Sequence, residues 1–135
     1  MLHHVSFGVS DIKRSAAFYD AALAPLGYIR VWEDLNPDDP DDPDQAIGYG
    51  LPGGGDKFAI KLSGEACRSP GPGFHLAFAS PNRQAVAFFH EAALAQGGLD
   101  NGAPGLRSHY GPNYFAAFVV DPDGHHIEAV CNSAA

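Results

Sequence analysis

Two stretches of the chain, residues 3–9 and 74–79, alternate between apolar residues and small or polar ones. A side-chain period of two is typical of a strand that buries one face, so each stretch predicts a strand. Each of the two carries a histidine, His4 or His75, on the side opposite its large apolar residues. The two strands therefore present the same kind of polar group in the same place.

A helical pattern follows each of these strands. For the first helix we expect Asp11 or Ser10 as the N-cap and Gly27 as the end, and for the second we expect Ser80 as the N-cap with Pro81 at the first helical position. Both helices carry an apolar stripe at helical spacing. The residues expected to face the core are Ile12, Ala16, Tyr19, Leu23, Val86, Phe89 and Ala93.

Short strand-like runs follow each helix and are separated by segments rich in glycine and proline. The runs are residues 28–33, 45–51, 57–62, 113–120 and 125–130, with a further short piece near 98–100. The sequence DPDG at 121–124 predicts a tight turn, because proline presets one backbone dihedral and glycine supplies a positive φ. Each half of the chain therefore predicts a strand, a helix and then further strands.

The two halves are related by an internal repeat with an offset of 71 residues. Residues 4–27 align with residues 75–98 without a gap, and nine of the 24 positions are identical, among them the pair His4 and His75. We therefore expect one α+β domain over residues 1–135, built from two βαβββ modules at 1–66 and 73–131. The modules must pack together, since one helix on one small sheet buries only one face of each.

Composition narrows the function classes. The formal net charge is −8 and the pI is about 5.1, which disfavours nucleic acid as a partner. No apolar run approaches the roughly 20 residues of a membrane span, and the N-terminus lacks the features of a signal peptide. We expect a cytoplasmic protein in which Cys67 and Cys131 are thiols, with a disulfide as the disfavoured alternative.

The repeat gives a chemical reason for a carboxylate in an apolar strand. Glu128 lies on the last strand of the second half, and a pseudo-twofold that superposes the halves would let His4 and His75 converge. Two imidazoles and a carboxylate are ligands of a divalent metal such as Zn, Ni, Fe(II) or Mn. The alternatives are ordinary hydrogen-bonded histidines, and a Glu128 paired with Lys57 or Lys61.

Three segments together resemble the vicinal oxygen chelate superfamily, which includes glyoxalase I, bleomycin- and fosfomycin-resistance proteins and extradiol dioxygenases. They are "HHVSFGVSDIKRSAAFYDAALAPLGY", "FHLAFAS" and "AAFVVDPDGHHIEAV". The resemblance covers nearly the whole chain. It implies paired βαβββ modules whose mixed or antiparallel sheets curl around a metal and substrate pocket, metal ligands at His4, His75 and Glu128, with Glu128 also catalytic, and a homodimer.

The resemblance has one departure. Glyoxalase I has a second carboxylate on the last strand of its first module, whereas here that position falls on Lys57 or Ala59, depending on the alignment. The sequence therefore predicts three protein ligands rather than four. That number is closer to the patterns of iron dioxygenases and metal hydrolases.

Two further segments belong near the expected pocket. In "GLRSHYGPNYF" at 105–115, His109 and Tyr110 are candidates for contact with the substrate, with a packed loop as the alternative. The acidic segment at 35–45 is expected to be a solvated loop, with a lid over the pocket as the alternative.

Two functions follow from these observations. The first is a metal-dependent lyase, isomerase or dioxygenase in which the metal ion acts as a Lewis acid on adjacent oxygens of a small substrate. The second is a protein that sequesters a ligand without catalysis, as bleomycin-resistance proteins do; the net charge of −8 would suit a cationic ligand.

Overall fold

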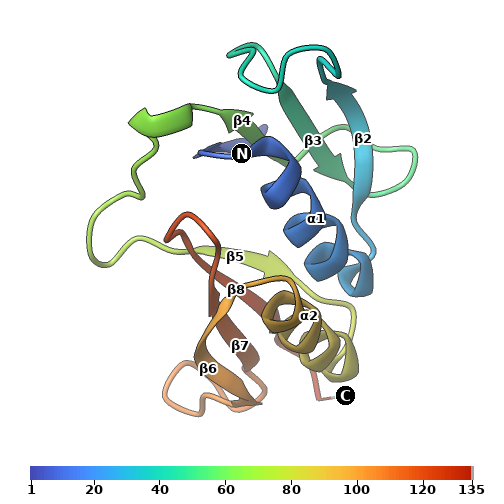
Figure 1. Cartoon of the computed structure of the whole chain (residues 1–135). Helices are drawn as coiled ribbons and strands as arrows, with labels where there is room; N and C mark the ends of the chain where they lie inside the picture. Colours follow the sequence, from blue (N-terminus) through green and yellow to red (C-terminus); the bar gives the residue numbers. More distant parts are fainter. Residues whose placement is uncertain (135) are drawn as a thin grey trace.

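The computed structural model describes residues 1–134 and contains the two predicted modules (Figure 1). The elements of the first are β1 (Val5–Val9), α1 (Ile12–Leu23), β2 (Ile29–Asp34), β3 (Ala46–Gly50) and β4 (Phe58–Leu62). Those of the second are β5 (Leu76–Ala79), α2 (Arg83–Ala95), β6 (Leu99–Leu106), β7 (Phe115–Val120) and β8 (His126–Cys131). Short 3-10 turns follow α1 at Ala24–Leu26 and β4 at Gly64–Ala66.

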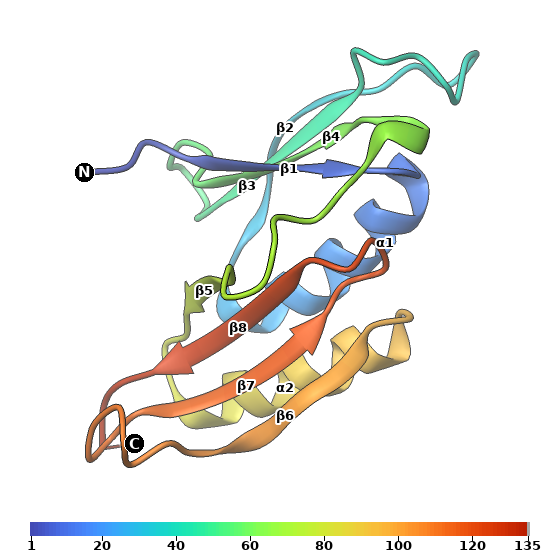
Figure 2. The same ribbon diagram turned by 90° about the vertical axis from the view of Figure 1, so that its left-hand side faces the viewer.

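Each module forms one four-stranded mixed sheet, in the equivalent orders β1-β4-β3-β2 and β5-β8-β7-β6. The first strand of each module lies parallel to the last, and the remaining pairs are antiparallel. This confirms the predicted α+β class and the βαβββ order. The two sheets do not join into a closed barrel; they lie apart, as Figure 2 shows, where β1 is seen from the side.

One face of each sheet packs against its helix, and α1 and α2 pack against each other between the modules. All seven helix residues expected to face the core are buried. The strands contribute the alternate side chains to the same cluster, for example Phe7 and Val9 from β1 and Ile127 and Ala129 from β8. The other face of each sheet therefore remains available for a site.

The start of the second helix differs from the prediction. The N-cap is Asn82 rather than Ser80, and its side-chain oxygen accepts a hydrogen bond from the backbone N–H of Ala85 at 2.8 Å. Ser80 instead stays with the sheet, since its N–H donates to the carbonyl of Val130. In the first helix the cap is Asp11, which was one of the two predicted residues.

Strand β6 is longer than the short piece predicted near 98–100. It runs over eight residues and contains Gly102, Pro104 and Gly105, with two register shifts against β7. Glycine and proline weaken a strand in the middle of a sheet, but an edge strand tolerates both, particularly next to bulges. The edge position of β6 therefore explains the difference.

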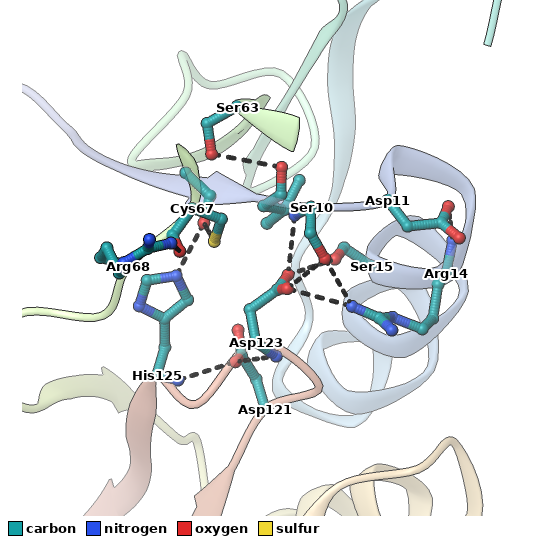
Figure 3. Close-up of polar contacts among 12 residues, drawn as sticks. Ser10, Asp11, Arg14, Ser15, Ser63, Cys67, Arg68, Asp121, Asp123 and His125 are labelled. Carbon is teal, nitrogen blue, oxygen red and sulfur yellow. Dashed lines mark hydrogen bonds and ion pairs between the residues drawn. The ribbon is translucent and has the colours of Figure 1, made fainter. Parts of the chain in front are cut away.

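The DPDG turn between β7 and β8 joins the two modules. Asp123 at its tip reaches α1 of the other module and accepts hydrogen bonds from Ser10 Oγ at 2.5 Å, Ser10 N at 3.1 Å and Arg14 Nη2 at 3.0 Å (Figure 3). Only 6% of the Asp123 side chain is exposed. The turn is therefore both a local connection and the main polar contact between the modules.

Two buried residues of the same turn reinforce this junction. Asp121 accepts a hydrogen bond from Tyr19 Oη of α1 at 2.6 Å, and burial raises the pKa of its carboxyl. His125 stacks on Phe7 with ring centroids 4.3 Å apart, and its Nε2 donates to the carbonyl of Gly8 at 2.7 Å. The second half of the chain is thereby fixed against the first strand and helix of the first half.

No helix within residues 1–134 is long and apolar enough to cross a membrane.

Candidate metal and substrate site

Glu128 lies on the open face of the second sheet, as the alternation of β8 requires. Its neighbours Ile127 and Ala129 point into the core beside α2, so Glu128 points the other way. Its cross-strand neighbours are Ala77 on β5 and Phe118 on β7. Only 1% of Glu128 is exposed, which makes it a buried carboxylate with small and aromatic neighbours.

Two side chains contact this carboxylate, one at each oxygen. His75 Nε2 lies 3.0 Å from Oε1, and Tyr114 Oη donates a hydrogen bond to Oε2 at 2.5 Å. The His75 side chain is half exposed, so the pair has one buried and one accessible member. Burial, followed by the bond to Glu128, raises the pKa of Tyr114 to about 12, so this phenol stays protonated and remains a donor at neutral pH.

The predicted substrate-side residues lie along a row of rings that leads to Glu128. The rings of His109 and Tyr110 are 4.1 Å apart between centroids, and those of Tyr110 and Tyr114 are 5.2 Å apart. Tyr110 is 63% exposed. The row therefore connects the solvent-exposed loop after β6 with the buried carboxylate, and the two assignments to substrate contact remain predictions.

Tyr114 is the residue of this site that the sequence analysis did not select. A usable signal was present, because Tyr114, directly before β7, continues the alternation of Ala116 and Phe118, and Phe118 is the cross-strand partner of Glu128. Same-face residues on neighbouring strands lie close enough to interact. The alternation alone therefore predicts that this phenol lies on the same face as Glu128.

His4 lies in the other module. It precedes β1, its ring nitrogen Nδ1 is 4.0 Å from Asp56 Oδ2, and the same nitrogen is 2.8 Å from Nδ1 of His3. Within residues 1–134 no three His, Cys, Asp or Glu side chains are grouped so that they could hold a metal ion. A single chain thus brings together His75 and Glu128 and leaves His4 apart from them, which differs from the convergence expected of the pseudo-twofold.

The strand registers identify the first-module equivalent of Glu128. Ala77 pairs with Glu128, and Ser6 pairs with Ala59. Since 77 − 71 = 6, Ser6 is the repeat partner of Ala77, and Ala59 is the equivalent of Glu128. The first of the two alignments considered for this position, with Lys57, is thereby excluded in favour of Ala59, and the first sheet offers no acid there.

Comparison with known proteins assigns the family. The family described as "Glyoxalase/Bleomycin resistance protein/Dioxygenase superfamily" matches residues 1–129. The chain belongs to this superfamily. The resemblance noted from the three sequence segments is thereby confirmed.

Solved structures of the superfamily share the fold. A glyoxalase/bleomycin resistance protein from Albidiferax ferrireducens is 32% identical, with a TM-score of 0.73 over 96% of this chain and 97% of its own. A glyoxalase-related enzyme from Fulvimarina pelagi is 23% identical, with a TM-score of 0.67 over 96% and 86% of the two chains. Glyoxalase I from Zea mays is 24% identical, with a TM-score of 0.66, and this chain matches 44% of its length. Among curated proteins, none matches this chain.

The pair of His75 and Glu128 fits a divalent metal in the chemistry of its donors. An imidazole nitrogen and a carboxylate oxygen are within 3.0 Å of each other, and both are ligands that zinc, iron and nickel accept in proteins. The carboxylate is buried, and within residues 1–134 no lysine or arginine forms an ion pair with it. A bound cation would compensate the cost of burying that charge.

Proposed function

We propose that this superfamily member is a metal-dependent enzyme acting on a small substrate with adjacent oxygens. The observation that carries the proposal is the contact between His75 and the buried Glu128 on the open face of the second sheet. A divalent ion held there would act as a Lewis acid that stabilises developing negative charge on a substrate oxygen. Lyase, isomerase and dioxygenase chemistry all use this kind of stabilisation.

The third ligand in the proposal is His4 from a second copy of the chain. The sheets of one chain are not closed; His4 directly precedes β1 of the first sheet, whereas Glu128 lies on the second sheet. A homodimer in which the first sheet of one copy faces the second sheet of the other would supply His4 to the pair. A twofold dimer would then contain two equivalent sites.

The remaining residues of the site have roles that follow from their contacts. Tyr114 fixes the orientation of Glu128 through the bond to Oε2, which leaves Oε1 directed at His75. Arg107 lies over the ring of Phe118, the neighbour of Glu128, with 5.4 Å between the guanidinium carbon and the ring centroid. We assign to His109 and Tyr110 the side of the pocket that a substrate meets first, because their rings are at its exposed end.

Complementation between two inactive variants tests both the ligands and the dimer. His4→Ala and His75→Ala are each expected to bind no metal after reconstitution with Fe(II), Ni, Zn and Mn in turn. When the two are unfolded and refolded together in equal amounts, half of the dimers are mixed, and each mixed dimer has one intact site of two. The mixture is therefore expected to bind about a quarter of the wild-type metal per chain, measured by elemental analysis.

The other outcomes are equally informative. No metal in the wild type after reconstitution would overturn the proposal. No recovery in the mixture would place His4 and His75 in the same site of one chain. Unchanged metal content in His4→Ala would show that this residue is not a ligand.

A second candidate function is sequestration of a ligand without catalysis. Two observations favour it. Ala59 stands where glyoxalase I has a second carboxylate, and the exposed ring of Tyr110 lies at the open end of the row of rings that leads to Glu128. The same samples decide between the two functions. If the protein sequesters a ligand, the metal-free wild type is expected to bind a cationic aromatic ligand at the rings of His109, Tyr110 and Tyr114. Turnover of α-ketoaldehydes, catechols or epoxides with bound metal would favour the enzyme.

A further inference from the structure

Arg107 directly follows β6, and its guanidinium lies on the open face of the second sheet, where Glu128 also lies. The guanidinium carbon is 5.4 Å from the centroid of the Phe118 ring, and Phe118 points to the same side as its cross-strand partner Glu128. The ring of His75 contacts that of Phe118 as well, with centroids 6.3 Å apart. The imidazole and the guanidinium are therefore no farther apart than these two distances together, a gap that a small molecule can span.

Glycines make room for this guanidinium on β6, which lies next to β7 at the edge of the sheet (Figure 2). A Cβ at Gly102 would lie 3.1 Å from Nη2 of Arg107, and one at Gly105 would lie 3.2 Å from Nη1. Both distances are shorter than ordinary van der Waals contact. Nη2 also donates a hydrogen bond to the carbonyl of Ala103 at 2.7 Å. The side chain is thus held beside the Phe118 ring before any ligand binds.

The charge of Arg107 has no counterion. Within residues 1–134 no carboxylate forms an ion pair with it, and the bond to Ala103 is the one hydrogen bond that its side chain donates. Arg14 and Arg30, by contrast, are paired with aspartates at 3.0 and 2.7 Å. A guanidinium has five N–H donors, and the Arg107 side chain is only partly buried. Most of its donors therefore remain available to a ligand.

The surrounding face is not acidic, although the whole chain has a net charge of −8. The strands of the second sheet contain two acids, Asp100 and Glu128. Asp100 lies on the helix side, since its carboxylate is 2.9 Å from Nε2 of His90 on α2. The charge of Glu128 would be offset by the proposed metal ion. A positive charge at Arg107 would then dominate the open face.

We propose that Arg107 binds a carboxylate of the substrate, so that the enzyme acts on a small organic acid whose carboxylate lies apart from the adjacent oxygens at the metal. One guanidinium matches the single charge and the planar shape of a carboxylate, with which it can form two parallel hydrogen bonds. Such a pair would fix the direction of the substrate relative to the metal. The inference rests on the proposed function for the metal end of the substrate, but the contact with Arg107 does not need the metal.

Two pairs of 2-oxo acids test the substrate class: 2-oxoglutarate with 2-oxopentanoate, and 2-oxoadipate with 2-oxohexanoate. Both members of a pair offer the same adjacent oxygens to a metal, and only the first has a carboxylate at the far end. Calorimetric titration of the metal-loaded wild type is expected to show at least about tenfold tighter binding of the dicarboxylate in at least one pair.

Two arginine variants test the location. Arg107→Met is expected to abolish the preference for the dicarboxylate and to leave the affinity for the monocarboxylate within about twofold, which also shows that the variant is folded. Arg83→Met is the matched control, because the guanidinium carbon of Arg83 is likewise 5.4 Å from a ring centroid, that of Phe115. Arg83 belongs to α2 on the other side of the sheet, so this variant should keep the preference.

A measurement without metal separates this inference from the proposed function. If the wild type binds no metal, the proposed function fails, and pentanoate is titrated into the metal-free protein instead. It is expected to shift the NMR signal of the Arg107 Nε–H saturably, whereas pentylammonium should not. Three results would overturn the assignment to Arg107: equal affinities within both pairs of acids, a preference that persists in Arg107→Met, or no saturable shift with pentanoate.

Discussion

At the scale of single residues, Tyr114 holds the carboxylate of Glu128, the proposed metal ligand, in its orientation. Its phenol donates to Glu128 Oε2, and it has no other hydrogen bond within residues 1–134. Tyr114→Phe keeps the ring contact with Tyr110 and removes only the donor. Groups that orient a metal ligand change metal affinity when lost, so we expect this variant to weaken metal binding by about 10- to 100-fold, measured by competition with a chelator.

The matched control is Tyr110→Phe. That hydroxyl makes no hydrogen bond with another side chain of the described residues, so its removal should leave metal affinity within about twofold of the wild type. Equal effects of the two variants would assign to Tyr114 a role in packing rather than in holding Glu128.

The same scale shows what a sequence can and cannot reveal about a site. Glu128 stood out because a carboxylate in an apolar strand needs a partner, and the repeat drew attention to His75. The contact at 3.0 Å between them could not be predicted, since it depends on the rotamers of both side chains and on the cover that Tyr114 provides. The same repeat predicts that His4 joins His75 at the metal. Equivalent positions in two modules, however, do not determine which way the two sheets face.

At the scale of elements, the DPDG turn acts through Asp123. Asp123→Ala removes the acceptor of four hydrogen bonds from Ser10, Arg14 and Ser15 and leaves the N–H of Ser10 without this partner. Because Asp123 is buried but Arg14 is half exposed, we expect a loss of about 1–3 kcal/mol in the free energy of unfolding, measured with urea.

Asp44→Ala is the control for this element. Its carboxylate lies in the exposed acidic loop and accepts no hydrogen bond within residues 1–134, so its removal should change the free energy of unfolding by less than about 0.5 kcal/mol. A comparable loss in both variants would mean that the turn does not hold the modules together.

The elements themselves were largely predictable, and the exceptions have local causes. Helical and strand periods identified both helices and seven of the eight strands at nearly full length, because apolar spacing reports burial directly. The repeat would also have corrected the second cap, since Asp11 plus 71 is Asn82. Strand β6 was underestimated because an edge strand with two glycines and a proline has neither the apolar alternation nor the composition of a central strand.

At the scale of the whole molecule, the offset of 71 residues predicts nearly everything about the modules and little about their assembly. It reproduces the strand order of each sheet and makes Ala59 the equivalent of Glu128. The arrangement of one module against the other depends instead on a few contacts without counterparts in the repeat, such as Tyr19 with Asp121 and His125 with Gly8. A chain with a helix on one face of each sheet still has two open faces.

The buried phenols of the core predict how the whole fold responds to alkaline pH. Burial raises the pKa of Tyr19 and of Tyr49 above the ordinary value of 10.0, and the nearby carboxylates of Asp121 and Asp20 raise them further. Above pH 10 the unfolded chain loses these protons while the folded chain keeps them. The contribution of these two phenols to the free energy of unfolding is therefore present below about pH 10 and is lost as the pH rises further. The slope of this loss approaches about 1.4 kcal/mol per pH unit for each phenol.

Tyr49→Phe isolates one of these contributions. The variant loses the hydrogen bond to Asp20 and is expected to be less stable than the wild type at pH 8. Between pH 10 and pH 11, however, its free energy of unfolding should fall by about 1 kcal/mol less than that of the wild type, in urea titrations. Tyr110→Phe is the control, since this side chain is 63% exposed and lies outside the core, and the variant should leave the slope unchanged. Parallel slopes for the wild type and Tyr49→Phe would mean that Tyr49 ionises in the folded protein, and that the contact between β3 and α1 opens before the core unfolds.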